Sequence, residues 1–527
     1  MKALGVMIDC SRDAVYTVEA LKQYFVLLRK MGYTYVQLYT EDVYELDAEP
    51  YFGYLRGRYT KQELKELDAA AQTNGLELVP CIQTLAHLGG ITRWKAYADI
   101  TDTGDILLAG EERTYGLIEK MFQTCAECFT SRRINIGMDE AHMVGLGKYL
   151  DRHGYENRFE ILLKHLTRVA QIAEKYGFSP MMWSDMFFRL ANGGDYYCAN
   201  NTIPQAVKQL VPKNVSLIYW DYYSTDRAHY DGMLSAHKEF ENPVVFAGGD
   251  SGWYGFAPHN RYAVRAWRAA MEACRENGVE DAFVTCWKDD GAECPLLATL
   301  PVLFSVAEFV RGNFDEENIA GKFRRFTGIT MEDFFALDEV NLNAEEVVNP
   351  CKYMLYSDPF LGIFDGTVQG SGAQFSIVRE QLQAGTKSVR YGYIFKTLMA
   401  LCDVLEIKYD LGVRTRKTYK ANDRGALAAL VADYKELEKR LEAFYSLFLA
   451  QRERECKPHG FEKQDIRLGG LMKRVAHCRR ILSEYLAGRR DRIEELEEHI
   501  LPFAGGQDGA PVRFNDWLHA AQIKPFM

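Results

Sequence analysis

The sequence predicts an α/β protein, a (β/α)8 TIM barrel over residues 1–312 that is followed by an all-helical domain over residues 313–527. Three observations predict this. Short apolar runs alternate with amphipathic segments in the first part, which is typical of βαβ units and a parallel sheet. Eight such units match the size of a closed barrel, about 250 residues or more. Beyond about residue 313, strand-like runs stop and helical periodicities take over.

The first three β/α units are marked by apolar runs and by helix-end signals. The runs that predict the strands cover residues 3–8, 34–39 and 76–82. The helix after the first strand places Val18, Leu21, Phe25 and Leu28 on one face. The second helix begins near Thr60 and stops at Asn74-Gly75, a typical C-cap signal.

The fourth unit contains the stretch around which we expect the rest to be organised, Arg133-Ile134-Asn135-Ile136-Gly137-Met138-Asp139-Glu140-Ala141-His142. Ile134, Ile136 and Met138 fit a short buried strand that runs into two adjacent carboxylates, Asp139 and Glu140. Barrel enzymes keep their chemistry at the carboxyl ends of the strands. The stretch therefore predicts a candidate catalytic pair.

Four more apolar runs complete the predicted barrel, over residues 180–183, 215–220, 243–247 and 282–287. A doubly wound open sheet is the alternative, but no GxGxxG follows the first strand. In the second domain, apolar residues recur at helical spacing and predict helix-on-helix packing. These stripes are Ile394, Leu398, Leu401 and Leu405; Leu427, Leu430, Tyr434, Leu437, Leu441 and Phe444; and Leu468, Leu471, Val475, Cys478 and Leu482.

Composition limits the classes of partner and the compartment. A formal charge of −10 over 527 residues disfavours nucleic acid and anionic membranes as main partners. No apolar run approaches the ~20 residues that span a bilayer. The chain enters its first strand almost at once, so we expect no signal peptide. Twelve scattered cysteines then indicate free thiols in a reducing cytoplasm. The apolar stripes of the helical domain fit a homodimer interface or a lid over the barrel equally well.

Polar and aromatic side chains gather at the predicted strand ends. In strand order these are Asp9 and Arg12; Tyr39, Glu41 and Asp42; His87; Asp139, Glu140 and His142; Trp183 and Asp185; Trp220, Asp221, Tyr222 and Tyr223; Asp250, Trp253 and Tyr254; and Trp287, Asp289, Asp290 and Glu293. Four of the seven tryptophans are among them. Aromatic faces stack on the apolar faces of sugar rings, and carboxylates and arginine bind pairs of hydroxyls. The pattern therefore indicates a carbohydrate pocket.

Two adjacent carboxylates do not suit ordinary glycoside hydrolysis. A retaining glycosidase places its carboxyls ~5–5.5 Å apart across the scissile bond, and an inverting enzyme places them farther apart. Neighbours such as Asp139 and Glu140 better fit substrate-assisted catalysis, in which the 2-acetamido oxygen of the sugar attacks the anomeric carbon. One carboxyl then protonates the leaving oxygen, and the other orients the acetamido group and stabilises its positive charge.

With these residues in view, the chain resembles glycoside hydrolase family 20, the exo-acting β-N-acetylhexosaminidases, in its small bacterial cytoplasmic branch. The family pattern H-x-G-x-D-E reads here Asn135-Ile136-Gly137-Met138-Asp139-Glu140, with Asn135 in place of the histidine. The aspartate and arginine of the first strand appear as Asp9 and Arg12, and the histidine of the third as His87. The W-x-E of the eighth strand becomes Trp287-Lys288-Asp289. The resemblance covers the barrel.

The resemblance implies a role for each matching residue. Glu140 would be the general acid/base, and Asp139 would orient the acetamido group. Arg12 would bind the O3 and O4 hydroxyls and Asp289 the O4 or O6 side. The walls would be formed by Trp183, Trp220 and Trp287, and we also place His87, Asp221, Tyr222 and Trp253 in the substrate site. The tyrosine that binds the acetamido oxygen stays open among Tyr222, Tyr223 and Tyr254.

The departure at Asn135 has a consequence for pH dependence. Asparagine can hydrogen-bond but cannot titrate, so we expect activity to survive with an altered pH profile. His142, two residues after Glu140, could substitute for the missing histidine or have no role.

The leading hypothesis is a cytoplasmic exo-β-N-acetylhexosaminidase that removes terminal GlcNAc or GalNAc from a small carbohydrate by a retaining mechanism. A non-catalytic sugar-binding barrel is the second reading, and a related substrate-assisted hydrolase acting on protein-linked GlcNAc is the third. We expect no cofactor, because the mechanism needs none. We expect no metal, because no His, Cys and carboxylate spacing resembles a ligand set.

Overall fold

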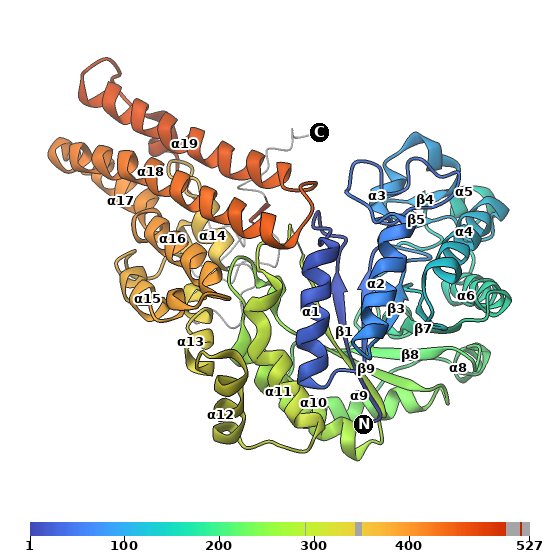
Figure 1. Cartoon of the computed structure of the whole chain (residues 1–527). Coiled ribbons are helices and arrows are strands. Elements are labelled where there is room, and N and C mark those ends of the chain that lie inside the picture. Colours follow the sequence, from blue (N-terminus) through green and yellow to red (C-terminus); the bar gives the residue numbers. More distant parts are fainter. Residues whose placement is uncertain (290, 343–349, 502–516, 519–527) are drawn as a thin grey trace.

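A computed structural model describes residues 1–289, 291–342, 350–501 and 517–518. Its first part is a closed barrel of eight parallel strands in the order β1-β10-β9-β8-β7-β6-β3-β2 (Figure 1). The strands are β1 (Ala3–Asp9), β2 (Tyr35–Tyr39), β3 (Glu77–Cys81), β6 (Arg133–Asn135), β7 (Ser179–Trp183), β8 (Ser216–Trp220), β9 (Val244–Gly249) and β10 (Asp281–Cys286). Register is continuous around the closure, where Ala3 pairs with Asp281 and Gly5 with Tyr35.

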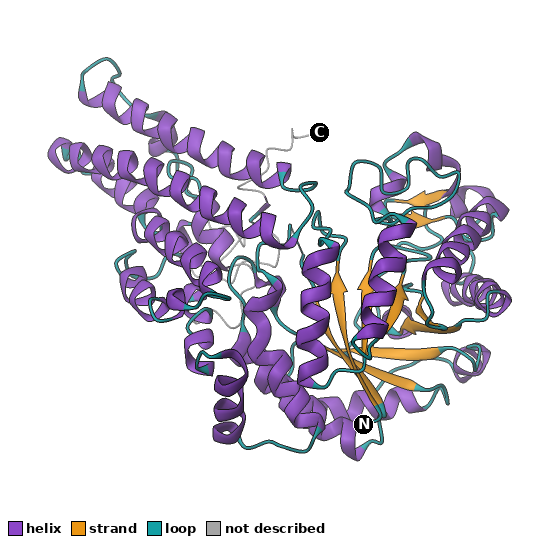
Figure 2. Ribbon diagram, in the orientation of Figure 1, coloured by secondary structure: helices purple, strands orange, loops and turns teal. Residues whose placement is uncertain are grey.

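Helices cover the outside of the barrel (Figure 2). The longer ones are α1 (Val18–Met31), α2 (Lys61–Thr73), α4 (Glu112–Cys128), α6 (Arg158–Lys175), α9 (Arg227–Lys238), α10 (Asn260–Glu276) and α11 (Leu300–Val310). Shorter elements decorate the loops: α3 (Gly89–Thr92), α5 (Lys148–His153), α7 (Asp185–Ala191), α8 (Gln205–Leu210) and the small antiparallel pair β4 (Thr101–Thr103) and β5 (Ile106–Leu107). Local signals set the ends of α2, where Thr60 and Glu63 form a capping box.

The fourth barrel strand, β6, is shorter than the sequence predicts. It ends at Asn135, so Ile136 and Met138 lie beyond it. Gly137 and Met138 both have φ of 73°, in the left-handed region that a strand cannot continue through. The chain therefore leaves the sheet before Asp139 and Glu140, and this break lets both carboxylates follow the strand end closely.

The second part is helical, as predicted, and shows no strand among its described residues (Figure 2). Its helices are α12 (Glu316–Thr327), α13 (Met331–Phe335), α14 (Pro350–Tyr356), α15 (Gln374–Leu382), α16 (Gly392–Lys408), α17 (Leu411–Lys420), α18 (Arg424–Glu455), α19 (Glu462–Leu486) and α20 (Glu494–Glu497). The stripe from Leu427 to Phe444 is buried on α18 against α16 and α19. The boundary at residues 312/313 stays a prediction; it falls between α11 and α12.

The long helices α18 and α19 form a hairpin whose turn reaches the barrel. Figure 1 shows this turn beside the carboxyl end of β1 and the start of α1. A single bridge pairs Tyr16 of the barrel with Cys456 of the turn. Across the described ranges, no helix has the length and apolar character needed to cross a membrane.

Candidate active site

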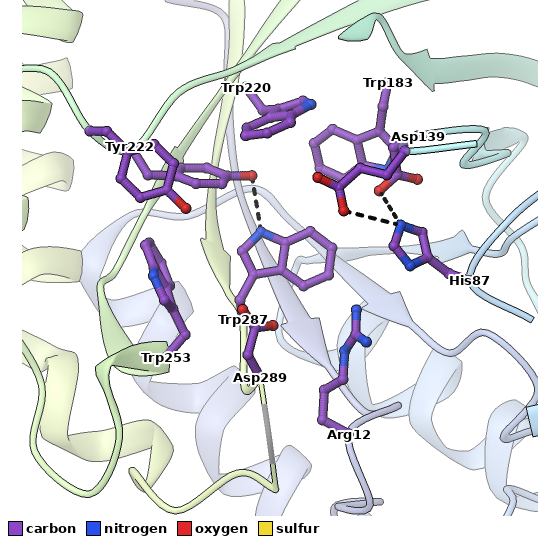
Figure 3. Close-up of a pocket in the computed structure, with 11 residues that line it drawn as sticks. Arg12, His87, Asp139, Trp183, Trp220, Tyr222, Trp253, Trp287 and Asp289 are labelled. Carbon is purple, nitrogen blue, oxygen red and sulfur yellow. Dashed lines mark hydrogen bonds and ion pairs between the residues drawn. The ribbon is translucent and has the colours of Figure 1, made fainter. Parts of the chain in front are cut away.

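One pocket at the carboxyl ends of the barrel strands collects the predicted site residues (Figure 3). It encloses about 520 Å³ of space, part of which is open to solvent. The residues that line it are Arg12, His87, Asp139, Glu140, Trp183, Trp220, Tyr222, Tyr223, Trp253, Trp287 and Asp289. Ten of these were expected as site residues from the sequence; Tyr223 joins them as one of the three tyrosines left open.

The backbone after β6 aims the two carboxylates into this pocket. Glu140 is itself left-handed, with φ of 51°. A Cβ on Gly137 would lie 2.0 Å from Oε1 of Gln83, so only glycine fits there. The same Gln83 oxygen accepts the N–H of Met138 at 3.1 Å. Non-glycine residues held at positive φ cost free energy and cluster at functional sites, so this turn is a candidate functional feature.

Asp139 is held as a carboxylate. Nε2 of Gln83 donates to its Oδ1 at 2.7 Å, and Nε2 of His87 lies 3.2 Å from its Oδ2. Burial alone would raise the pKa of Asp139, but the charge of His87 and the hydrogen bond from Gln83 hold it below its usual value. Asp139 can therefore stabilise positive charge that develops in the pocket.

His87 is the cation that faces both carboxylates, and its Nε2 also lies 3.7 Å from Oε2 of Glu140. Its own backbone is left-handed, with φ of 57°. Burial opposes protonation, but the charge of Asp139 outweighs it and raises the pKa of His87 to about 10. The imidazole is therefore an imidazolium at neutral pH.

Glu140 is more open than its neighbour, with 40% of its side chain exposed. Its Oε1 lies 3.3 Å from a terminal nitrogen of Arg189, and its N–H donates to Oδ2 of Asp185 at 3.0 Å. Nε of Arg189 donates to the same Asp185 oxygen at 3.0 Å. Burial, followed by the charge of Asp139, raises the pKa of Asp185 to about 7. Asp185 and Arg189 thus hold the backbone and the side chain of Glu140 from behind.

Aromatic rings form the walls of the pocket. The Trp183 and Trp287 ring centroids are 5.9 Å apart, and Trp220 stacks on Tyr222 at 5.3 Å. Nε1 of Trp287 donates to the hydroxyl of Tyr222 at 2.9 Å, which locks these walls together (Figure 3). Trp253 lies behind Tyr222, with centroids 5.2 Å apart. The walls offer flat apolar faces on several sides, as a sugar ring requires.

Arg12 and Asp289 approach the pocket from the same side, opposite Trp220 (Figure 3). Arg12 Nε lies 3.5 Å from Asp9 Oδ2, and a terminal nitrogen lies 3.5 Å from Glu41 Oε1. Asp9 is itself fixed, because it accepts the N–H of Ser11 at 2.9 Å. Arg12 and Asp289 thus place one positive and one negative side chain on this side of the pocket, and both can bind hydroxyl groups.

Two of the predicted substrate-site candidates, Asp221 and Tyr254, do not line the pocket. Asp221 is not among the lining residues: its carboxylate accepts the hydroxyl of Tyr219 at 2.7 Å and the N–H of Tyr223 at 3.2 Å. In this arrangement Asp221 supports the Tyr223 backbone, and its contact with substrate stays a prediction. Tyr254 does not line the pocket either and stacks on His259 at 4.9 Å. Asp290 lies outside the described residues.

Asn135 occupies a structural place below the pair. It is fully buried, its Oδ1 accepts the N–H of Gly137 at 3.0 Å, and its Nδ2 donates to Gln37 Oε1 at 3.2 Å. It therefore supports the turn that carries Asp139. Within the described part of the chain, no group of three or more His, Cys, Asp or Glu is arranged to hold a metal ion.

Comparison with known families follows the same division of the chain. The model of the family 20 glycosyl hydrolase catalytic domain matches residues 33–234. The model of the glycoside hydrolase 20C C-terminal domain matches residues 329–514. One match thus falls in the barrel and the other in the helical part.

Curated relatives are more distant. Hexosaminidase D of Homo sapiens is 25% identical over 340 residues, which are 59% of this chain and 66% of that protein. Hexosaminidase D of Bos taurus is 25% identical over 229 residues, 41% of this chain and 61% of that protein. The chain thus spans less than two thirds of the length of these relatives. A solved exo β-N-acetylglucosaminidase from Vibrio harveyi is similar with a TM-score of 0.48 and 14% identity, over 66% of this chain and 58% of that one.

Proposed function

The chain belongs to glycoside hydrolase family 20, and on that premise we propose that it is an exo-acting β-N-acetylhexosaminidase. Its substrate is a small carbohydrate or glycoconjugate with a terminal, non-reducing, β-linked GlcNAc or GalNAc. The observation that carries the proposal is the adjacent pair Asp139 and Glu140, which a left-handed turn presents to an aromatic pocket.

In the first step, the carboxyl of Glu140 gives its proton to the glycosidic oxygen as the bond to C1 breaks. The acetamido oxygen of the same sugar attacks C1 from the opposite face, and a cyclic oxazolinium ion forms. Asp139 accepts the acetamido N–H and stabilises the positive charge that spreads onto that nitrogen. Its low pKa supports this role, because a protonated Asp139 could do neither.

In the second step, the Glu140 carboxylate takes a proton from water, and the water oxygen attacks C1 on the face that the aglycone has left. The ring opens, the acetamido group is restored, and the product keeps the β configuration. Glu140 ends protonated, ready for the next cycle. The open side of Glu140 suits an exchange of aglycone for water.

The aromatic walls of the pocket and its two charged side chains bind the sugar ring. Trp183, Trp220 and Trp287 surround the ring and its acetamido group, and Arg12 and Asp289 bind the O3, O4 and O6 hydroxyls. Such a pocket accepts only the end of a chain, which gives exo action. We place the reaction in a reducing cytoplasm, which the twelve free cysteines support. A homodimer through the helical domain stays a prediction.

A substrate panel tests the proposal. Wild type should hydrolyse p-nitrophenyl β-GlcNAc and β-GalNAc but not the β-glucoside, which has no internal nucleophile. Asp139→Asn should lose about 10²- to 10³-fold in kcat on both acetamido sugars. Asp151→Asn, an exposed carboxamide control on α5, should behave as wild type.

Leaving-group dependence separates the two carboxylates. Glu140→Gln should lose more on a disaccharide, whose leaving alcohol needs a proton, than on a p-nitrophenyl glycoside, whose leaving group needs little help. Asp139→Asn should lose equally on both. Comparable cleavage of the glucoside would refute the substrate-assisted mechanism. Sugar binding without turnover of any substrate would instead indicate a binding barrel.

A further inference from the structure

The α18–α19 hairpin of the helical domain contacts the barrel loop that carries Arg12. The N–H of Thr17 donates to the carbonyl of Glu455 at 2.9 Å, and the N–H of Lys457 donates to the carbonyl of Val15 at 2.7 Å. These bonds enclose the bridge between Tyr16 and Cys456. Backbone bonds of this kind fix a loop in position, because they leave its main chain little freedom. The end of the β1–α1 loop is thus fixed by the second domain (Figure 1).

Asp13, the neighbour of Arg12, makes backbone and side-chain contacts with the helical domain. It is left-handed, with φ of 57°. Its carbonyl accepts a guanidinium N–H of Arg452, and its carboxylate pairs with Lys463. A Cβ on Gly460 would lie 1.9 Å from that carbonyl, so the turn packs against it without space for a side chain. Any shift of the hairpin would therefore move Asp13, and Arg12 with it.

Arg452 also holds the loop after β10, which carries Asp289. The side chain is buried, and its second guanidinium nitrogen donates to the carbonyls of Gly291 at 3.4 Å and Ala292 at 3.5 Å. Gln464 of α19 adds a bond to the Gly291 carbonyl at 3.4 Å. One guanidinium therefore connects two loops of the barrel mouth, and each loop presents one charged residue to the pocket.

We propose that Arg452 and Lys463 are positioning residues that set the distance between Arg12 and Asp289, so that the helical domain forms part of the sugar subsite. The inference rests on the proposed function, in which Arg12 and Asp289 bind the ring hydroxyls. Neither Arg12 contact within the barrel is shorter than 3.5 Å, so its place depends on the loop that bears it. A shift of about 1 Å is enough to weaken hydrogen bonds to the ring hydroxyls.

Kinetics of three variants test this. Lys463→Ala removes the pair with Asp13 at a side chain that is 46% exposed, so the fold should tolerate it. Arg452→Lys keeps the charge but cannot reach both loops with one planar group. Lys473→Ala is the matched control, an exposed lysine on the same helix. Lys463→Ala and Arg452→Lys should raise KM for p-nitrophenyl β-GlcNAc about 3- to 10-fold with kcat nearly unchanged, because hydroxyl binding is shared by ground and transition states. The control, Lys473→Ala, should leave both KM and kcat at their wild-type values.

Two comparisons separate positioning from general destabilisation. The GlcNAc to GalNAc ratio of kcat/KM should change in both variants, because O4 is equatorial in one sugar and axial in the other. In an Arg12→Ala background the same substitutions should have little further effect. Equal losses on both sugars, or an undiminished effect without Arg12, would overturn the inference and leave the hairpin as a stabilising element only.

Hydrogen exchange keeps the test independent of activity. Without any substrate, Lys463→Ala and Arg452→Lys should speed amide exchange in residues 10–17, and Lys473→Ala should not. If wild type hydrolyses no substrate but this difference is found, the proposed function fails and the hairpin still positions the loop. Unchanged exchange in residues 10–17 would refute the positioning role whatever the activity.

Discussion

Replacement of His87 by glutamine should change the pH dependence of catalysis more than its rate at high pH. The substitution removes a cation that faces Asp139 at 3.2 Å but keeps an N–H donor. Wild-type His87 carries its charge through neutral pH, because its pKa is raised to about 10 and the imidazolium is lost only as pH rises through that value. In His87→Gln, Asp139 loses its main stabilising charge and its pKa must rise. The protonated fraction of Asp139 then grows as pH falls.

The size of the effect follows from the separation. Two unit charges 3.2 Å apart interact by about 5 kcal/mol at an effective dielectric constant of about 20. Desolvation of both groups offsets part of this, and loss of one partner of a buried pair costs about 3–5 kcal/mol. We therefore expect kcat/KM to fall by up to about 10²- to 10³-fold at the acid end of the profile and little at high pH. The loss should deepen about tenfold per pH unit on the acid side of the new Asp139 pKa.

The assay is kcat/KM for p-nitrophenyl β-GlcNAc between pH 5 and 9, read after alkaline quench. His142→Gln is the matched control, since that exposed histidine follows Glu140 but does not line the pocket. In Asp139→Asn, adding His87→Gln should cost little more, because the carboxylate through which His87 acts is gone. A loss that is the same at every pH would refute the reasoning and assign His87 to substrate contact alone.

Three further results are expected. Asn135→His should alter the kcat/KM profile between pH 5 and 8, because it puts a titratable group below the catalytic turn; a superimposable profile would contradict this. Asp185 has a pKa raised from 3.8 to about 7, so its contribution to the unfolding free energy is full below pH 4 and falls by up to about 4 kcal/mol as pH rises through 7. Urea unfolding at pH 5 and pH 8 should therefore show a smaller pH difference in Asp185→Asn than in wild type. Tyr222→Phe should lose about 10- to 100-fold in kcat/KM on acetamido sugars and Tyr223→Phe less, since Tyr222 is locked to the Trp287 wall; the reverse order would assign the acetamido contact to Tyr223.

The barrel could be predicted because its signals are local. Each strand is a short apolar run, and each predicted run overlaps an observed strand. The helical domain was equally readable, because its stripes repeat at the spacing that buries Leu427 and Leu441 on α18. The exception is the end of the fourth strand. Ile136 and Met138 have the apolar pattern of strand residues, but the backbone at Gly137 and Met138 is left-handed. Alternating apolar character records burial, and both residues are buried without belonging to the sheet.

Only those site residues that follow the end of a barrel strand could be predicted. Barrel geometry brings residues at eight strand ends together, so Arg12 and Asp289 could be placed in one pocket although they are far apart in the chain. Whether a given side chain points into the pocket or away from it could not be predicted. Asp221 follows β8 just as Tyr222 does, yet it turns away from the pocket to accept the Tyr219 hydroxyl. The choice depends on side-chain hydrogen bonds that no periodicity records.

Residues that hold Asp139 and Glu140 in place gave weaker signals in the sequence. Gln83 lies two residues beyond β3 and is neither charged nor aromatic, so nothing in the sequence separates it from a buried polar loop residue. Arg189 had a usable signal: it lies four residues after Asp185, at the spacing that places two side chains on one helix face. The Asp185–Arg189 pair could have been predicted from that spacing, but its contact with Glu140 could not.

The contact between Arg452 and Asp13 marks where sequence reasoning ends. The two residues are 439 positions apart and belong to different domains, and the heptad-like stripe that predicts α18 gives Arg452 no role. Arg452 can position the two loops because the last turn of α18 reaches the barrel mouth, where Arg12 and Asp289 lie on separate loops. A barrel alone fixes strand ends but leaves its loops free to diverge. In this chain a second domain supplies that constraint, so sugar specificity should respond to residues that never touch the sugar.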